Sequence, residues 1–109
     1  MADINMEEKN PVRKYNLPDK VMEDIITTAK KNGIKKVILF GSRARGTHTD
    51  RSDIDLAASG GSVLDFYYDL EEEARTLLLF DVVNLNNGIS SELQAEINKD
   101  GVVLYEEVL

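Results

Sequence analysis

A short, highly charged connection between two apolar segments is the feature that most constrains how this chain can fold. Residues 37–40 form an apolar run rich in β-branched side chains, and residues 52–58 (SDIDLAA) alternate polar and apolar side chains. Runs of this length and pattern predict β-strands. The connection between them, residues 41–51, begins with glycine and carries three arginines. The two strands therefore flank a turn that concentrates charge.

Helical and strand-like patterns alternate along the rest of the chain. Apolar side chains recur at helical spacing over residues 18–29 and again over residues 63–77. Residues 78–85 predict a third strand, Leu93 and Ile97 anchor a last helix, and residues 102–105 predict a small edge strand. A short helical turn is expected at residues 42–45, and Ser62 and Ser91 are the expected caps of the helices that follow them.

This succession of elements predicts the fold class. The order α-β-α-β-α-β-α-β favours one α/β (α+β) domain over residues 16–109, in which a single sheet is covered by helices. Residues 1–15 show no clean periodicity, and we expect them to be a flexible lead-in.

The composition narrows the classes of function. The chain has 109 residues, a formal net charge of -7 and no cysteine, so a disulfide framework and a thiolate zinc site are both excluded. The negative charge argues against a broad basic face for long nucleic acid, although the three local arginines suit a single phosphate-bearing ligand. No apolar run approaches membrane-spanning length and the N-terminus is charged, so we expect a cytoplasmic protein without membrane association.

Carboxylates on the predicted strands indicate a metal site. Asp53 and Asp55 are two residues apart, which places their side chains on one face at roughly 6.5–7 Å along the backbone. Asp81 is positioned to join them from a neighbouring strand. Because three acidic groups at one place repel each other, the cluster predicts a neutralising Mg²⁺, with Mn²⁺ as the alternative ion. Two such ions activate an attacking oxygen and stabilise a leaving phosphate in phosphoryl transfer.

The turn after the first strand has the composition of a phosphate site. Glycine at position 41 lets backbone approach a phosphate closely, and Ser42 adds a hydroxyl. The turn would hold the phosphates of a nucleotide while the aspartates hold its metal ions.

These residues resemble a known family. Gly41-Ser42, ten intervening residues and then Asp53-Ile54-Asp55 is similar to the GS-x10-DxD signature of the polymerase-β-like nucleotidyltransferases, and in particular to their minimal nucleotidyltransferase (MNT) group. The resemblance implies a mixed sheet, ATP as nucleotide donor and two Mg²⁺ ions on Asp53 and Asp55. It also implies a third carboxylate, Asp81, as general base or metal ligand.

The same resemblance implies contacts to the nucleotide and a partner protein. Gly41 and Ser42 would contact the β- and γ-phosphates, with Arg43 or Arg45 nearby. Larger members carry a helical domain that presents the acceptor, whereas MNT proteins often pair with a HEPN-domain toxin. In such a pair the MNT protein is the antitoxin and transfers AMP from ATP to a tyrosine of the HEPN protein.

Three hypotheses follow. The first is an Mg²⁺-dependent nucleotidyltransferase that modifies a protein hydroxyl, with Asp53, Asp55 and Asp81 at the catalytic centre. The second is a catalytically inactive antitoxin that neutralises its partner by forming a complex. The third, transfer to a small molecule such as an aminoglycoside, is disfavoured because the sequence contains no acceptor-binding domain.

Overall fold

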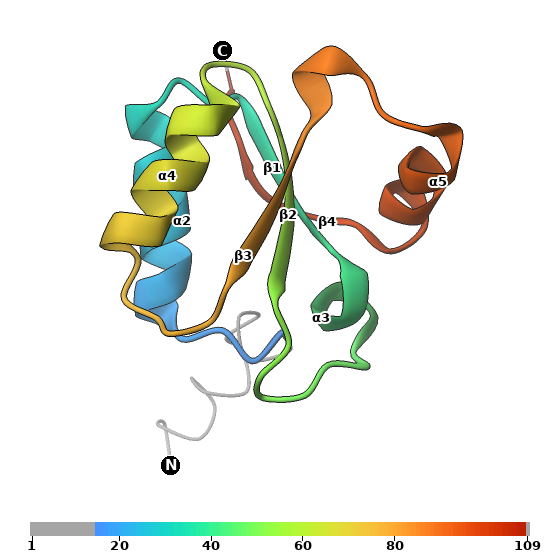
Figure 1. Ribbon diagram of the computed structural model, residues 1–109, viewed down its shortest axis with the longest axis horizontal. Coiled ribbons are helices and arrows are strands. Elements are labelled where there is room, and N and C mark those ends of the chain that lie inside the picture. The colour runs from blue at the N-terminus through green and yellow to red at the C-terminus, as the bar shows by residue number, and fades with distance from the viewer. Residues whose placement is uncertain (1–14, 109) are drawn as a thin grey trace.

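A four-stranded mixed sheet forms the centre of the protein (Figure 1). The computed structural model describes residues 15–108. The strands lie in the order β3-β2-β1-β4, and their bounds are β1 Lys36–Phe40, β2 Ile54–Ser59, β3 Phe80–Asn84 and β4 Val102–Glu106. Strand β1 is antiparallel to both β2 and β4, whereas β2 and β3 are parallel. The predicted mixed sheet flanked by helices is therefore confirmed.

Helices cover both faces of this sheet (Figure 1). Helices α2 (Asp19–Lys31) and α4 (Val63–Glu73) pack side by side on one face. The short helix α3 (Gly41–Arg45) and helix α5 (Ser91–Asp100) lie on the other, and a 3₁₀ turn, η2 (Leu85–Asn87), follows β3. Within residues 15–108, no helix is long and apolar enough to span a bilayer.

Strand alternation divides the buried side chains between two apolar clusters. The larger cluster lies under α2 and α4 and includes Leu56 and Phe66, whereas the smaller one contains Phe40, Ala57 and Ile97. Because Asp55 and Ala57 are two residues apart on β2, the carboxylate of Asp55 belongs to the face that α3 and α5 cover. The predicted facing of β2 is thereby confirmed.

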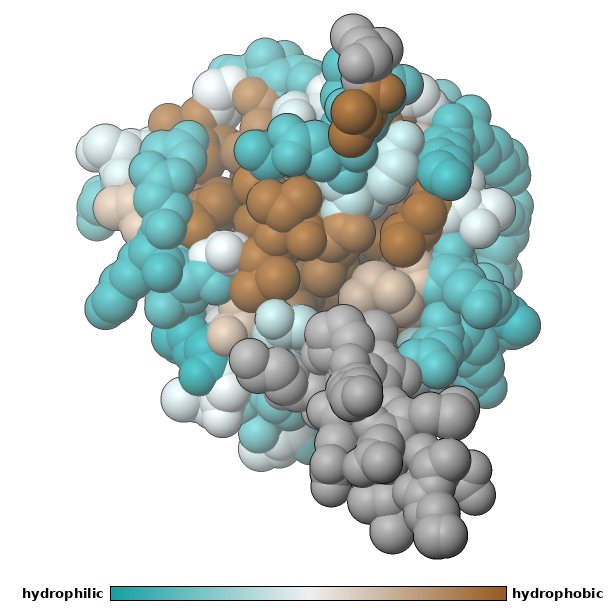
Figure 2. All heavy atoms as spheres, turned by 180° about the vertical axis from the view of Figure 1, so that it is seen from behind, coloured by the Kyte–Doolittle hydropathy of each residue, from teal (hydrophilic) through white to brown (hydrophobic). Residues whose placement is uncertain are grey.

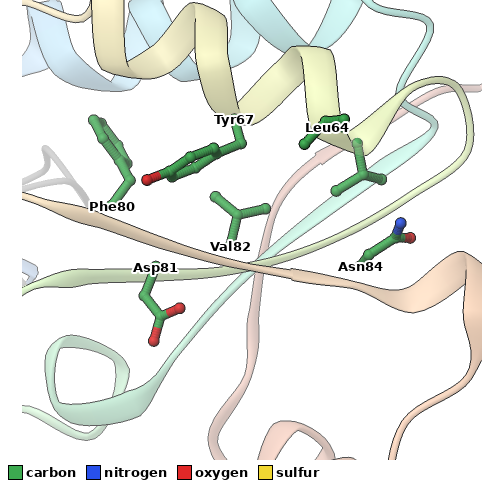
Figure 3. A pocket seen from close by; sticks show the side chains of 7 residues that line it. Leu64, Tyr67, Phe80, Asp81, Val82 and Asn84 are labelled. Atoms are coloured by element: carbon green, nitrogen blue, oxygen red, sulfur yellow. The ribbon is translucent and has the colours of Figure 1, made fainter.

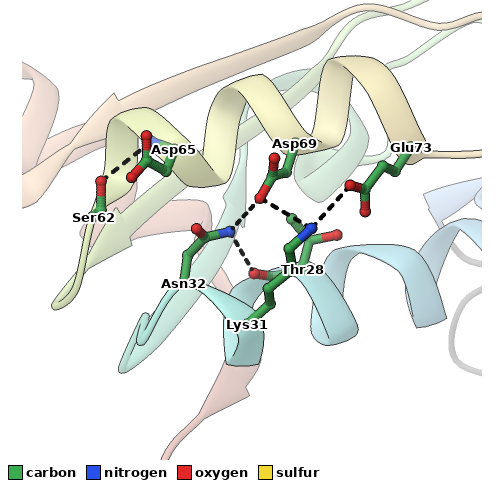
Figure 4. Close-up of polar contacts among 7 residues, drawn as sticks. All are labelled: Thr28, Lys31, Asn32, Ser62, Asp65, Asp69 and Glu73. Atoms are coloured by element: carbon green, nitrogen blue, oxygen red, sulfur yellow. Dashed lines mark hydrogen bonds and ion pairs between the residues drawn. The ribbon is translucent and has the colours of Figure 1, made fainter.

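Hydrogen bonds and ion pairs join α2 to α4 across their exposed sides (Figure 4). Asn32 donates to the carboxylate of Asp69 at 3.0 Å, and Lys31 Nζ lies 2.9 Å from Glu73 and 3.4 Å from Asp69. The hydrogen bond from Asn32, helped by the charge of Lys31, lowers the pKa of Asp69. Two acidic side chains of α4, Asp69 and Glu73, are thus occupied by contacts with α2.

Two helix boundaries differ from the sequence-based expectation. Helix α4 ends at Glu73, and the side chain of Leu77, expected on its apolar stripe, is fully exposed. The segment after α4 is held instead by Arg75, which donates from its backbone and its guanidinium to Asp24 of α2. At the start of α5 the cap is Ser90, one residue earlier than expected, because its hydroxyl accepts the N–H of Leu93.

The opposite side of the molecule shows an apolar area in the middle of its surface, surrounded by hydrophilic side chains (Figure 2). Strand β4 is an edge of the sheet, as its sequence predicted, and its side chain at Val103 is about half exposed.

Candidate active site

Three adjacent strands bring the sequence-predicted site residues together. Asp55 pairs with Phe40 at the end of β1, so it lies beside Gly41, the next residue along the chain. On its other side Asp55 is in register with Asp81 of the parallel strand β3. Residues far apart in sequence, at positions 41, 55 and 81, therefore meet on one face of the sheet, as the strand pattern predicted.

Asp53 comes directly before β2 and is not part of it, because β2 begins at Ile54. This position differs from the expected strand over residues 52–58. The side chains of Asp53 and Asp81 are exposed and make no hydrogen bond with another described residue, whereas Asp55 is half-buried. Burial, and then the negative charges of Asp81 and Asp53, raise the pKa of Asp55. A cation at this place would remove that repulsion.

Gly41 allows the close approach between the turn and the carboxylate. Its φ of +75° lies in the left-handed region that favours glycine, and a Cβ built there would overlap Oδ2 of Asp55. The same turn leads into α3, where the hydroxyl of Ser42 makes no hydrogen bond with another described residue. The turn therefore places the buried backbone of Gly41 and the partly exposed residue Ser42 directly beside Asp55.

Arg43 differs from the expectation that it contacts phosphate. It is 1% exposed, and its guanidinium donates to the backbone carbonyls of Tyr15, Asn16, Asp50 and Ser52 at 2.8–3.5 Å. These contacts use all five N–H donors of the side chain. Burial lowers the pKa of Arg43 while nearby aspartates oppose the shift. The residue fixes the loop that ends at Asp53, so we omit it from the phosphate-binding set.

Arg45 remains available at the surface of the site. Its side chain is 40% exposed, and Nη1 lies 3.6 Å from Oε1 of Glu96 on α5. Glu96 was not singled out from the sequence, because a glutamate on the polar side of a predicted helix is usually solvated. Only the packing of α3 against α5 brings it to this place.

The donor set fits a hard divalent cation in its chemistry. Carboxylate oxygens are the ligands that Mg²⁺ and Mn²⁺ prefer, and Asp53 and Asp81 are free to turn. As the side chains stand within residues 15–108, no three acidic or histidine groups converge on one point. Cation binding therefore requires side-chain rotation at Asp53 or Asp81, which their exposure permits.

A mixed sheet that sets a Gly-Ser turn beside paired aspartates defines the class of protein as a nucleotidyltransferase. The family model described as polymerase beta, nucleotidyltransferase matches residues 23–108. The chain belongs to the polymerase beta nucleotidyltransferase family.

Individual relatives agree with this assignment. A protein of Methanocaldococcus jannaschii, named "Putative protein adenylyltransferase MJ0604", is 32% identical over 99 residues, which cover 80% of this chain and 97% of that protein. A crystal structure of a toxin-antitoxin with AMP-PNP matches with a TM-score of 0.64 at 23% identity, over 79% of this chain and 73% of the other. A mutant of the toxin-antitoxin MntA-HpeT gives 0.63 at 23% identity, over 84% and 75%. These structures share the fold.

Replacing Gly41 tests the close approach to Asp55. Gly41→Ala combines an unfavourable φ with overlap against a carboxylate, whereas the matched variant Gly46→Ala has a φ of +85° and open space around its Cβ. We expect Gly46→Ala to lower the free energy of unfolding by about 1–2 kcal/mol. Overlap should add about 1–3 kcal/mol for Gly41→Ala. Urea denaturation measures both, and equal losses would contradict the assigned contact.

Replacing Arg43 separates a structural role from a phosphate-binding role. We expect Arg43→Met to lower the free energy of unfolding by about 2–4 kcal/mol, because several carbonyls lose their donor. The control Arg51→Met, at an exposed arginine of the same loop, should stay within about 0.5 kcal/mol of the parent. Unchanged stability together with weakened ATP binding in Arg43→Met would restore the phosphate assignment.

Proposed function

We propose that this protein transfers AMP from ATP to a hydroxyl group of a partner protein and releases pyrophosphate. The observation that carries the proposal is the strand register that sets Asp55 beside both Gly41 and Asp81. A half-buried carboxylate flanked by two others, next to a Gly-Ser turn whose serine is partly exposed, provides one place for cations and one for phosphates. Adenylyl transfer is favoured by the name of the Methanocaldococcus jannaschii relative and by the AMP-PNP in the structural neighbour.

Each residue has a defined task in this proposal. Asp53 and Asp55 would hold two Mg²⁺ ions, and these ions would offset charge on the phosphates and steady the leaving pyrophosphate. The acceptor oxygen forms a bond to the α-phosphorus of ATP, while the bond from that phosphorus to the pyrophosphate oxygen breaks. Asp81 takes the proton of the acceptor hydroxyl. Gly41, Ser42 and Arg45 orient the β- and γ-phosphates by positioning and charge.

A toxin of the HEPN class, with a tyrosine as acceptor, is the proposed partner. The MNT resemblance of the GS-x10-DxD motif supports this choice, and the structural neighbours come from toxin-antitoxin complexes. In this proposal the described residues supply the nucleotide site on one sheet, and the partner supplies the acceptor hydroxyl.

The experiment uses ATP labelled at the α-phosphate, the partner protein encoded by the adjacent reading frame, and Mg²⁺. We expect Asp53→Asn and Asp55→Asn to lower transfer by at least about 100-fold, because charge stabilisation at the reacting phosphate is lost. Glu92→Gln, at an exposed acidic residue of α5 that does not act on Asp55, is the matched control and should retain transfer. Thermal melting verifies that each variant is folded. Normal transfer in the two aspartate variants would refute the site.

A second candidate function is neutralisation by complex formation alone. The observation that favours it is an apolar surface beside the free edge of β3, where a hollow of about 270 Å³ is lined by α4 and β3. Leu64, Leu77 and Leu79 are all at least 60% exposed on the segments around it. Glu71 lines the adjoining hollow between the end of α4 and the start of β3, is exposed and makes no ion pair with another described residue, so a partner segment with apolar and basic side chains fits this surface.

The two candidate functions use opposite faces of the same strand. Figure 3 shows Phe80, Val82 and Tyr67 on the side of the hollow, whereas the carboxylate of Asp81 points to the other side of β3. Adjacent residues of a strand point to opposite faces. Asp81 also lines the hollow, so docking is separated from the chemistry only by substitution of the other residues around it.

Substitution at Leu77 tests the docking surface without disturbing the core. Because Leu77 is fully exposed, Leu77→Asp should change the free energy of unfolding by less than about 0.5 kcal/mol. We expect it to weaken the complex with the same partner protein at least about ten-fold, measured by calorimetry. Val108→Asp is the control, at another highly exposed apolar residue. Equal affinities of the two variants would exclude this surface as the interface.

A further inference from the structure

Two exposed side chains from different helices meet at the edge of the acidic site. Arg45 is in the last turn of α3, and Glu96 is in the middle of α5. Their side chains are 40% and 45% exposed, and Nη1 of Arg45 lies 3.6 Å from Oε1 of Glu96. The two helices pack against each other on the face of the sheet that carries Asp55. The pair therefore lies at the border of the catalytic face.

Both charges of this pair act on Asp55. The negative charge of Glu96 adds to those of Asp81 and Asp53 in raising the pKa of Asp55, and the positive charge of Arg45 opposes them. Because charge effects at an exposed surface fall off within about 10 Å, Glu96, Arg45 and Asp55 form one local group. The packing of α5 against α3 and β1 places Glu96 on the same face of the sheet as Asp55.

Arg45 is the arginine of α3 whose guanidinium is available to a ligand. All donors of Arg43 are used by backbone carbonyls. The ion pair between Arg45 and Glu96 is long and exposed, so it is weak and exchangeable. A triphosphate carries more negative charge than one carboxylate and accepts paired N–H donors of an arginine, so it competes effectively for the same guanidinium.

We propose that Glu96 is a positioning residue that holds Arg45 at the border of the site and competes with the phosphates of ATP for it. When ATP binds, Arg45 exchanges the carboxylate of Glu96 for a phosphate oxygen. Glu96 thereby lowers the affinity for nucleotide, and this effect of Glu96 requires the side chain of Arg45. This inference rests on the proposed function, because it assumes that ATP is the ligand.

Calorimetric titration of ATP at saturating Mg²⁺ tests the competition directly. We expect Glu96→Gln to bind ATP about two- to five-fold more tightly than the parent, the range expected when one exposed ion pair no longer competes. Glu92→Gln, one turn earlier on α5, removes the same charge from a residue that does not act on Asp55 and should leave the affinity unchanged. Glu96→Asp, which retains the charge, should resemble the parent more closely.

A double-mutant cycle distinguishes competition for Arg45 from simple repulsion of phosphate. Arg45→Met should weaken ATP binding, and Glu96→Gln should then have no further effect. If Glu96→Gln still tightens binding in the Arg45→Met protein, Glu96 acts by direct repulsion and the inference is wrong. Weaker binding by Glu96→Gln alone would also overturn it, because Glu96 would then orient Arg45 toward the phosphates.

The outcomes separate this inference from the proposed function. ATP binding by the parent with identical affinity in Glu96→Gln would overturn the role of Glu96 and leave adenylyl transfer standing. Absence of ATP binding by the parent protein would overturn both. Circular dichroism of each variant verifies that the helices are retained. Because both side chains are exposed, we expect neither substitution to unfold the protein.

Discussion

The buried guanidinium of Arg43 is the contact on which the geometry of the site depends. It donates hydrogen bonds to the backbone of Tyr15 and Asn16 and to the loop at Asp50 and Ser52. Arg43 itself is part of helix α3, which begins at Gly41. The turn and the loop leading to Asp53 are thus fixed by one side chain. A charge buried in this way is stable only when its hydrogen bonds are complete, so the loop has a single favourable path.

The register between β2 and β3 positions the carboxylates of the site. Asp55 and Asp81 face each other because β2 and β3 are parallel and paired residue by residue. Burial raises the pKa of Asp55, and the negative charges of the neighbouring Asp81 and Asp53 raise it further. Burial of the two apolar clusters stabilises the fold and offsets the unfavourable repulsion among these carboxylates.

The pattern of apolar residues was sufficient to predict a single sheet and the shared face of Asp55 and Asp81, because side-chain alternation along a strand is a local property. Asp53 was expected on the same strand as Asp55 but lies directly before it. It could not assign Arg43, since an arginine in a polar loop has the same sequence signature whether it is buried or solvated. Glu96 was missed because its proximity to Arg45 depends on packing between elements distant in sequence. The end of α4 was misplaced because Leu77 continues a helical spacing, while the hydrogen bonds of Arg75 direct the chain elsewhere.

Strand β3 is paired on one side only, and this has a steric consequence for any acceptor. In the described part of the chain no strand lies beyond it, so the flank of the sheet next to Asp81 is open to large molecules. Under the proposed function, an acceptor presented by another folded protein would approach this carboxylate along the unpaired edge of β3. The edge position of the strand is thus suited to a substrate as bulky as another protein.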